Sequence, residues 1–495
     1  MAKRISKTQY LMGLQCPKRL WLYNHRRDLV PPPDAALQGL FDEGHAVDEL
    51  LRLALPGGEL VEYDDRRLHL ALKRTTALVK DGPRFIYEGA FAAGDALVRC
   101  DILERNYDGS WDLIEAKSAS GVHDEHLPDA AVQRCVLEGC GLKINKVWLL
   151  CLDGAYVRRG PLDPEKLFKR EDITAQTAGL LPGVRENLAK FMRLIAAGEM
   201  PEVAIGRHCS APHDCEFRGH CWKGLPDYSI FDIPRLAWEK KNLLHLQGVL
   251  KFTDVPNSFG LNEVQRLYQR VERTGQAVIN RPAIRTFLNT LEYPLYYLDF
   301  ETLMPGIPLY DGTRPYQQLP FQASLHVQAS PGLEPEHFEY LGDSFNDPRP
   351  GLIKALCGNI GRNGSLVAYN AGFEAARLKE LAEDFPASRS ALLGLADRLA
   401  DLMKPFQQQL YVDPLFKGRY SIKVVLPALV PELTYEGLPI ANGAAAQQAY
   451  SNLVHNRLNP DEREKARRDL KEYCGQDTLA MVKIMAKLYA VAADL

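Results

Sequence analysis

The sequence lacks the features that mark several special classes of protein. No run of apolar residues approaches the roughly 18 that a membrane-spanning helix requires, and the N-terminal Met-Ala-Lys-Arg-Ile-Ser leads directly into a polar helical pattern. Neither a membrane span nor a signal peptide is therefore expected. The 10 cysteines in 495 residues are too few for a disulfide scaffold. We expect a cytoplasmic protein whose cysteines serve as buried thiols, metal ligands or reactive groups.

An excess of positive charge is also missing. The formal net charge of −3 gives none of the basic character that nucleic-acid-binding domains usually show. Carboxylates gathered around catalytic metals would lower the total, however, and basic pairs such as Arg158-Arg159, Lys169-Arg170 and Lys240-Lys241 could still contact phosphates. Each pair is more commonly a solvated surface feature. Net charge therefore counts only mildly against a protein that acts on nucleic acid.

The length and hydropathy pattern predict two α/β domains joined by a connector. Single cores stop growing beyond roughly 250–300 residues, so a chain of 495 residues should divide. Residues 1–225 alternate between helical and strand patterns. Residues 226–290 are polar and helical without a strand pattern, and residues 291–495 return to α/β before a long C-terminal helical region.

Individual elements are expected at specific places in both domains. In the first, helices are predicted over Thr8–Arg26, Ala36–Leu53 and Asp124–Gly139, and strands over Glu59–Tyr63, Phe85–Phe91, Ala96–Glu104, Trp111–Lys117 and Lys146–Leu152. In the second, strands are predicted over Tyr296–Phe300, Phe321–Val327, His337–Leu341 and Leu366–Tyr369.

Two carboxylates and a lysine in the first domain have the spacing of a hydrolytic metal site. Asp101 lies in an alternating strand and is followed, after a turn, by Glu115-Ala116-Lys117. Carboxylates on adjacent strands can hold one Mg²⁺ or Mn²⁺, and the lysine can orient water or stabilise developing negative charge. The alternative is an exposed hairpin with a solvated Glu-x-Lys pair, which is common.

The register of the hairpin provides a test. If Asp108-Gly109 were a two-residue loop, Asp101 would pair with Ala116 and point away from Glu115. If Tyr107-Asp108-Gly109 is the loop, with glycine in the left-handed conformation, Asp101 lies opposite Glu115. The functional interpretation requires the three-residue loop.

Two more residues extend this pattern. His45 lies on an amphipathic helix upstream and Gln133 on the helix after the strands, although a lone helical histidine is more often structural. In this order, His45, Asp101, Glu115-x-Lys117 and Gln133 resemble the RecB-like branch of the PD-(D/E)xK nuclease superfamily over residues 1–225. The resemblance implies a restriction-endonuclease-like fold in which His45, Asp101 and Glu115 bind metal, Lys117 is catalytic and Gln133 belongs to the same site.

Four cysteines flank these motifs. Cys16 is followed almost two hundred residues later by Cys209-x5-Cys215-x5-Cys221, and four thiolates can hold a [4Fe–4S] cluster or a tetrahedral Zn²⁺. The remaining cysteines are expected to pack as small hydrophobic residues: Cys100, Cys135, Cys140, Cys151, Cys357 and Cys474.

The distant first cysteine and the later trio resemble the iron–sulfur exonucleases, including AddB-type helicase–nuclease subunits and CRISPR-associated RecB-like exonucleases. The resemblance implies a cluster that joins the two ends of the domain. This sequence departs from the commonest trio, whose first gap is short. Zinc therefore remains the alternative, with His208, His213 and His220 as spare ligands.

A second set of acids lies in the C-terminal domain. Asp299 and Glu301 are two apart on a predicted strand and so share one face. Glu374 follows another strand at the start of a helix, and Tyr473 and Asp477 are four apart on one helical face. Four converging acids could bind two divalent cations. Asp401 and Asp413 are rival acids, which we interpret as a helix or loop residue and a turn former before Pro414.

These motifs resemble the DEDD family of 3′–5′ exonucleases with an RNase H-like fold, over residues 293–490, in the subgroup that ends in Tyr-x3-Asp. The resemblance implies that Asp299, Glu301 and Asp477 bind metal and that Tyr473 helps to position water. One departure is Glu374, which stands where the family has Asp.

The two halves together resemble an uncharacterised bacterial family that fuses an iron–sulfur RecB-like domain to a DEDD exonuclease domain. We expect a DNA-directed nuclease that acts on single-stranded or end-exposed substrate, in repair or in defence against foreign DNA. The alternatives are an RNA-processing 3′–5′ exonuclease and a nucleic-acid-binding scaffold with one decayed site, which Glu374 suggests.

Overall fold

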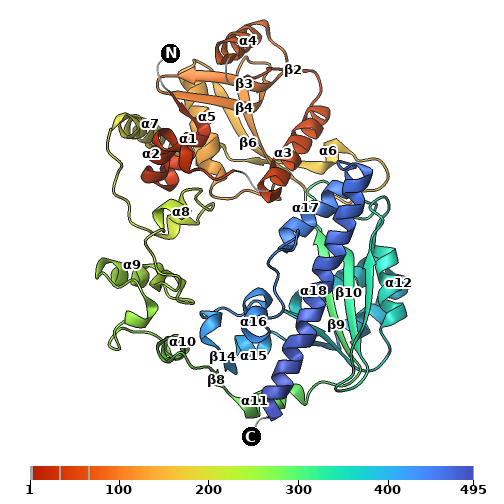
Figure 1. Ribbon diagram of the computed structural model, residues 1–495. Helices are drawn as coiled ribbons and strands as arrows, with labels where there is room; N and C mark the ends of the chain where they lie inside the picture. The colour runs from red at the N-terminus through yellow and green to blue at the C-terminus, as the bar shows by residue number, and fades with distance from the viewer. Residues whose placement is uncertain (1–3, 33–34, 65–66, 494–495) are drawn as a thin grey trace. The chain divides into compact units, whose positions relative to one another are not determined.

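The structure, a computed structural model, describes residues 4–32, 35–64 and 67–493. Two compact units make up the chain, one containing residues 1–224 and 305–317 and the other residues 225–304 and 318–495. Both are mixed α/β (Figure 1). No helix within these described ranges is long and apolar enough to cross a membrane.

The first unit is built on a seven-stranded sheet. Its strands and helices are β1 (Ile5–Ser6), α1 (Lys7–Gln15), α2 (Pro17–His25), α3 (Ala35–Ala54), β2 (Gly58–Leu60), α4 (Leu68–Asp81), β3 (Phe85–Ala93), β4 (Ala96–Arg105), β5 (Trp111–Lys117), α5 (His126–Gly139), β6 (Ile144–Leu152), α6 (Pro164–Leu167), β7 (Phe168–Asp172), α7 (Thr174–Ala196) and α8 (Arg218–Cys221).

Strand β1 pairs with β4 near the centre of this sheet. The main path is β2-β3-β4-β5-β6-β7, with β5 antiparallel to β4 and parallel to β6. Strand β4 pairs with β5 only from Ile102 onward, and its first residues pair instead with β1, through Ile5↔Ala96 and Ser6↔Leu97. Helix α1, which follows β1 directly, therefore starts next to the middle of the sheet.

One helix predicted near the N-terminus is in fact two. Cys16 is extended, with φ of −160° and ψ of 119°, and α2 begins at Pro17. Proline lacks a backbone N–H and disfavours a helical conformation in the residue before it, which explains the break. The strand predicted over Glu59–Tyr63 is shorter, and helices α4 and α7 were not predicted.

The second unit contains a five-stranded sheet and a two-stranded one. Its elements are α9 (Trp238–Leu246), α10 (Glu263–Thr274), β8 (Val278–Ile279), α11 (Arg281–Leu288), β9 (Leu295–Leu303), β10 (Leu319–Gln328), β11 (Glu336–Leu341), α12 (Arg349–Asn359), β12 (Ser365–Ala368), α13 (Gly372–Asp384), α14 (Arg389–Ala396), β13 (Leu399–Asp401), α15 (Lys404–Gln407), β14 (Tyr411–Val412), α16 (Ile422–Leu429), α17 (Gly443–Val454) and α18 (Pro460–Ala493).

Residues 226–290, for which we expected a helical connector, cluster with the second unit. They include strand β8, which pairs antiparallel with β14. A two-residue strand carries no readable alternation, so sequence pattern alone could not reveal this pairing.

The side chains of strand β9 point alternately to the two faces of the sheet, and helices pack against them on both faces. Leu295 and Tyr297 pack with α11, α16 and α18 in one buried cluster. Tyr296, Leu298 and Phe300 pack with α12, α13 and α14 in another. In Figure 1 the long helix α18 runs along β9 and β10. The sheet order is β11-β10-β9-β12-β13, with β9 in the centre.

Candidate functional site

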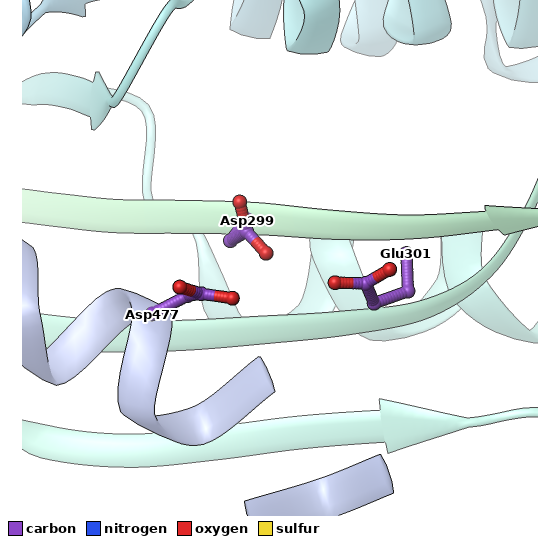
Figure 2. A group of neighbouring side chains, drawn as sticks. All are labelled: Asp299, Glu301 and Asp477. Carbon is purple, nitrogen blue, oxygen red and sulfur yellow. The ribbon is translucent and has the colours of Figure 1, made fainter. Parts of the chain in front are cut away.

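Three carboxylates converge in the second unit, and we call Asp299, Glu301 and Asp477 the acidic cluster. Alternation along β9 gives Asp299 and Glu301 the face that packs against α18, which carries Asp477. One ligand oxygen from each residue lies within 4.8 Å of the other two, and Figure 2 shows the three carboxylates turned toward a common space. Among the described residues, no other group of three or more Asp, Glu, His or Cys ligands is this close.

Glu374 is a fourth acid beside this cluster. It lies in the first turn of α13 and is only 2% exposed. Its Oε2 atom has no hydrogen-bond partner. Because a buried, unpaired carboxylate oxygen is costly, this atom is suited to accept a cation or a donor from a ligand.

A lysine and two tyrosines surround Asp477. Tyr435 donates a hydrogen bond of 2.5 Å to Asp477 Oδ1. Lys423 Nζ donates to the Tyr473 hydroxyl at 3.1 Å and to the carbonyl of Ala441 at 2.6 Å. Neither Lys423 nor Tyr435 could be identified from the sequence, since both come from segments distant from the motifs.

Cys474 is a further member of this site. Its thiol is buried and lies 3.7 Å from Asp299 Oδ2, to which it can donate. The prediction that it would pack as a small hydrophobic residue was therefore incomplete. The same prediction was wrong for Cys140 and Cys357, which are exposed.

Burial and mutual repulsion make these acids hard to ionise. Burial, followed by Asp477 and Glu301, raises the pKa of Asp299 well above its usual range. Burial, followed by Asp477, raises the pKa of Glu301 to about 8, although Lys423 opposes this shift. Burial raises the pKa of Asp477 to about 6 despite the hydrogen bond from Tyr435, and burial also raises that of Glu374 to about 8. A bound cation would relieve this repulsion.

The acids line a cavity of about 330 Å³ within the second unit. Its wall also includes polar side chains able to contact a ligand, namely Gln318, Asn370, Lys423, Gln447 and Tyr473. Phe373 and Tyr369 add aromatic surface. Such a mixture of acids, donors and rings can hold a cation together with a polar, partly aromatic ligand.

The hairpin of the first unit has the register that the functional interpretation requires. Ile102 pairs with Ile114 at the end of the ladder, and continuing this register places Asp101 opposite Glu115. Gly109 has a φ of +81° in the loop. Of the two loops considered, the structure has the three-residue one that the functional interpretation requires. The Asp101 side chain accepts a hydrogen bond of 2.8 Å from the backbone N–H of Ala116.

Four charged side chains form a closed network at this place, which we call the lysine–carboxylate quartet: Lys7, Glu115, Lys117 and Asp129. Lys117 Nζ lies 2.7 Å from Glu115 Oε1 and 2.6 Å from Asp129 Oδ2. Lys7 Nζ lies 2.9 Å from the same Glu115 oxygen and 3.4 Å from Asp129 Oδ1.

Gln133 completes the network from α5. Its Nε2 donates to Glu115 Oε2 at 2.6 Å and to Asp129 Oδ1 at 3.1 Å, and its buried Oε1 has no partner. Lys7 and Asp129 were missed by the sequence analysis. The Asp-x3-Gln spacing on α5 is the one signal that could have identified Asp129, since residues four apart share a helical face.

The lysines of the quartet stabilise the charge of Glu115. Burial alone would raise the pKa of Glu115, but Lys117 and Lys7 lower it below its ordinary value. Burial alone would lower the pKa of Lys117, but Glu115 and Asp129 raise it. Asp129 and Asp101 differ, since burial followed by Glu115 raises the pKa of each, that of Asp101 well above its usual range.

His45 does not join the carboxylates in this structure. It is exposed on α3, and no hydrogen bond or ion pair links it to Asp101 or Glu115 among the residues described. Burial raises the pKa of Asp48, one turn later on the same helix, while Arg52 and His45 oppose the shift and Glu115 adds to it. The expected metal-binding role of His45 therefore has no geometric support.

The four predicted cysteines line one small cavity of the first unit. Cys16, Cys209, Cys215 and Cys221 surround it together with Lys18, Arg19, His208 and Arg218. Burial raises the pKa of Cys215 to about 11, and it also raises the pKa of Cys16 and of Cys221. Without a metal these thiols stay protonated.

The two rival acids have different surroundings. Asp413 caps a short 3₁₀ helix by accepting a hydrogen bond of 2.9 Å from Leu415 N–H, which confirms its expected role as a turn former. Asp401 ends strand β13, so the expectation of a helix or loop residue was wrong. Its Oδ1 accepts from the N–H groups of Asn370 and Met403.

Comparison with known proteins adds similarities without a described activity. Residues 296–421 match a family model described as a domain of unknown function, DUF2779. Over 288 residues the chain is 29% identical to the uncharacterized protein UU173 of Ureaplasma parvum, a match covering 53% of this chain and 41% of the relative. Over 215 residues it is 28% identical to the uncharacterized protein MG366 of Mycoplasma genitalium, covering 40% of this chain and 32% of the relative.

The chain thus matches less than half the length of these curated relatives. A solved structure titled "Crystal structure of SSO0001" aligns with 46% of this chain and 89% of that chain, at 15% identity and a TM-score of 0.24. That score is too low to carry an argument about the fold.

Proposed function

We propose that the protein is a metal-dependent nuclease that hydrolyses phosphodiester bonds in DNA. The observation that carries the proposal is the acidic cluster, whose carboxylates converge from β9 and α18 within 4.8 Å at the wall of a cavity. The order of its motifs resembles DEDD exonucleases, and a mixed sheet with β9 in the centre agrees with the RNase H-like fold which that resemblance implies.

The residues present fit a divalent cation. Mg²⁺ and Mn²⁺ prefer oxygen ligands, and this cluster offers carboxylate oxygens whose pKa values are raised by burial and repulsion, with the unpaired Glu374 Oε2 close by. Asp299, Glu301 and Asp477 would hold the cation, and Glu374 is long enough to contribute. When bound, such cations supply a more acidic water and stabilise the leaving oxygen.

The chain's own residues have complementary tasks in this proposal. Tyr435 orients the Asp477 carboxylate through its hydrogen bond. Lys423 holds the Tyr473 hydroxyl and places a positive charge at the cavity wall, where a substrate phosphate would carry negative charge. Tyr473, fixed in this way, can position water for attack.

The size of the cavity favours chain ends as the substrate. A volume of about 330 Å³ lies at the lower limit of small-molecule sites, which suits a terminal nucleotide better than a stretch of duplex. We therefore propose an exonuclease that acts on single-stranded or end-exposed DNA. Phe373 and Tyr369 offer rings on which a terminal base can stack.

The first unit is proposed as a second nuclease site of the RecB-like type. Asp101 and Glu115 would hold a cation, Lys117 would stabilise the developing charge, and Gln133 would orient Glu115. The confirmed register and the unpaired, buried Oε1 of Gln133 support this assignment.

The four cysteines are proposed to hold a [4Fe–4S] cluster. All four thiols line one cavity, as a shared metal centre requires. The resemblance of the cysteine pattern to iron–sulfur exonucleases favours the cluster, with zinc as the alternative. The lysine and arginines around the cavity would offset the negative charge of a cluster with four thiolates.

The test is a cleavage assay with labelled single-stranded DNA and matched RNA, in Mn²⁺ or Mg²⁺, on protein purified without oxygen. Wild type is compared with Lys117→Ala, Asp299→Ala and the exposed control Asp397→Asn. Loss of cleavage in one site variant assigns the chemistry to that unit, and partial loss in both indicates two working sites. Preference for RNA would favour RNA processing, and absence of cleavage on every substrate would favour a binding protein.

A further inference from the structure

Lys7 reaches the first unit's candidate site because β4 and β5 diverge there. The pairing of β4 with β5 begins at Ile102, and β1 occupies the edge of β4 before that point. Ser6 then caps α1 through a reciprocal hydrogen-bond pair with Gln9, which fixes the start of the helix. Lys7 is the first residue of this helix, so its backbone is held beside Glu115.

The ammonium group of Lys7 shares its partners with Lys117. Both lysines lie within 3 Å of Glu115 Oε1, at 2.9 Å and 2.7 Å. Both also contact Asp129. The Glu115 side chain is 1% exposed while that of Lys7 is 23% exposed, so Lys7 approaches a buried carboxylate from the solvent side.

Within the quartet, the ammonium groups of Lys7 and Lys117 match the carboxylates of Glu115 and Asp129 in number without a divalent cation. Asp101 is a third acid beside them. A cation bound to Glu115 Oε1 would lie close to the Lys7 ammonium, and like charges at such separations repel strongly in a partly buried site. Lys117 is already part of the Glu-x-Lys motif, whereas Lys7 comes from a separate element and has no role in that pattern.

We propose that Lys7 competes with the metal for Glu115. Its ammonium group binds Glu115 Oε1 when no divalent cation is present, and it must leave this oxygen before a metal can bind there. This inference rests on the metal site proposed for the first unit and adds a residue that controls its occupancy. Because Lys7 is partly exposed and has a flexible side chain, its ammonium group can turn to solvent or to a substrate phosphate. The Glu115 side chain is buried and is also held by Lys117 and Gln133.

The test is a direct measurement of Mn²⁺ binding by calorimetry, independent of cleavage. The parent protein carries Asp299→Asn and Asp477→Asn, which remove the acidic cluster as a binding site. Lys7→Met and Lys7→Gln are expected to bind Mn²⁺ at least about ten-fold more tightly than the parent, equivalent to about 1.4 kcal/mol. Lys7→Arg, which keeps the charge, and the exposed control Lys73→Met are expected to match the parent.

Two neutral variants are used in case one of them fails to fold. Glutamine can still donate a hydrogen bond to Glu115, whereas methionine preserves only the length of the side chain. Equal Mn²⁺ affinity in the parent and in both folded neutral variants would overturn the inference while leaving the proposed nuclease untouched. Absence of Mn²⁺ binding in all variants would overturn it as well, and would in addition remove the first unit's metal site from the proposed function.

Discussion

Replacing Asp299 by asparagine should stabilise the second unit when divalent cations are absent. The Asp299 carboxylate lies within 4.8 Å of those of Glu301 and Asp477. Two unit charges at this distance repel by about 3 kcal/mol at an effective dielectric constant near 20. Burial and repulsion keep these groups partly protonated, which reduces the cost. We therefore expect Asp299→Asn to gain about 2 kcal/mol, or roughly 4–8 °C in Tm.

The same substitution should lose its advantage when a cation is bound. A ligand at 100 times its Kd stabilises the folded state by about 2.7 kcal/mol, and wild type should receive more of this than Asp299→Asn, which lacks one ligand. Thermal unfolding of both proteins, in EDTA and in saturating Mn²⁺, measures the difference. Asp397→Asn, an exposed change in the same unit, should shift neither curve by more than about 0.5 kcal/mol.

The stabilities of wild type and Asp299→Asn, with and without Mn²⁺, distinguish charge repulsion from a packing effect. Asparagine has nearly the same shape as aspartate and can still accept from Cys474, so packing predicts little change. If Asp299→Asn were less stable than wild type in EDTA, or if Mn²⁺ stabilised both proteins equally, the cluster would not be a cation site held together against its own repulsion.

Three further outcomes are expected. Burial, followed by His337, lowers the pKa of His326 to about 4. Between about pH 6.5 and 4, the unfolded chain then binds a proton that the folded chain does not. The free energy of unfolding should therefore be highest above this window and fall by up to about 3 kcal/mol as the pH drops through it. In urea unfolding at several pH values, His326→Gln should show a smaller pH dependence. Cys215→Ser should abolish the visible absorbance of an iron–sulfur cluster in protein purified without oxygen, whereas the exposed control Cys357→Ser should retain it; a coloured Cys215→Ser protein would contradict the cluster. Lys423→Met should lower the exonuclease rate by about 100-fold, and Lys423→Arg should recover most of it, as measured by kcat on single-stranded DNA; equal rates in the two variants would show that the charge is not used.

The parts of the sites that lie within one element could be predicted from the sequence. Asp299 and Glu301 share a face because strand residues alternate, and Tyr473 and Asp477 share one because helical residues four apart are neighbours. These shared faces depend on a local period, which the sequence displays directly. The opposition of Asp101 and Glu115 depends instead on loop length, which the sequence left open between two and three residues.

The partners that come from distant elements could not be predicted in this way. Lys7 reaches Glu115 across 108 positions in the chain, through the pairing of β1 with β4. Lys423 reaches Tyr473 across 50 positions. No period links such residues, and a single lysine at a helix start is indistinguishable from a solvated one. The exposed position of His45 has the same origin, since an amphipathic pattern predicts a helix but does not fix how the helix is rotated against the sheet.

The lysine–carboxylate quartet and the acidic cluster balance their charges in opposite ways. In the quartet, two ammonium groups lie between two carboxylates at 2.6 to 3.4 Å, so the folded unit compensates its own charge. In the acidic cluster, Lys423 opposes the raised pKa of Glu301 and Arg377 that of the nearby Glu374, yet the pKa values of these acids still rise. In the second unit, the folded state contains repulsion between carboxylates that a bound cation would relieve. In the first unit, a bound cation would have to displace the ammonium group of Lys7. Of the two proposed metal sites, the acidic cluster is therefore the one whose charge a bound cation would balance.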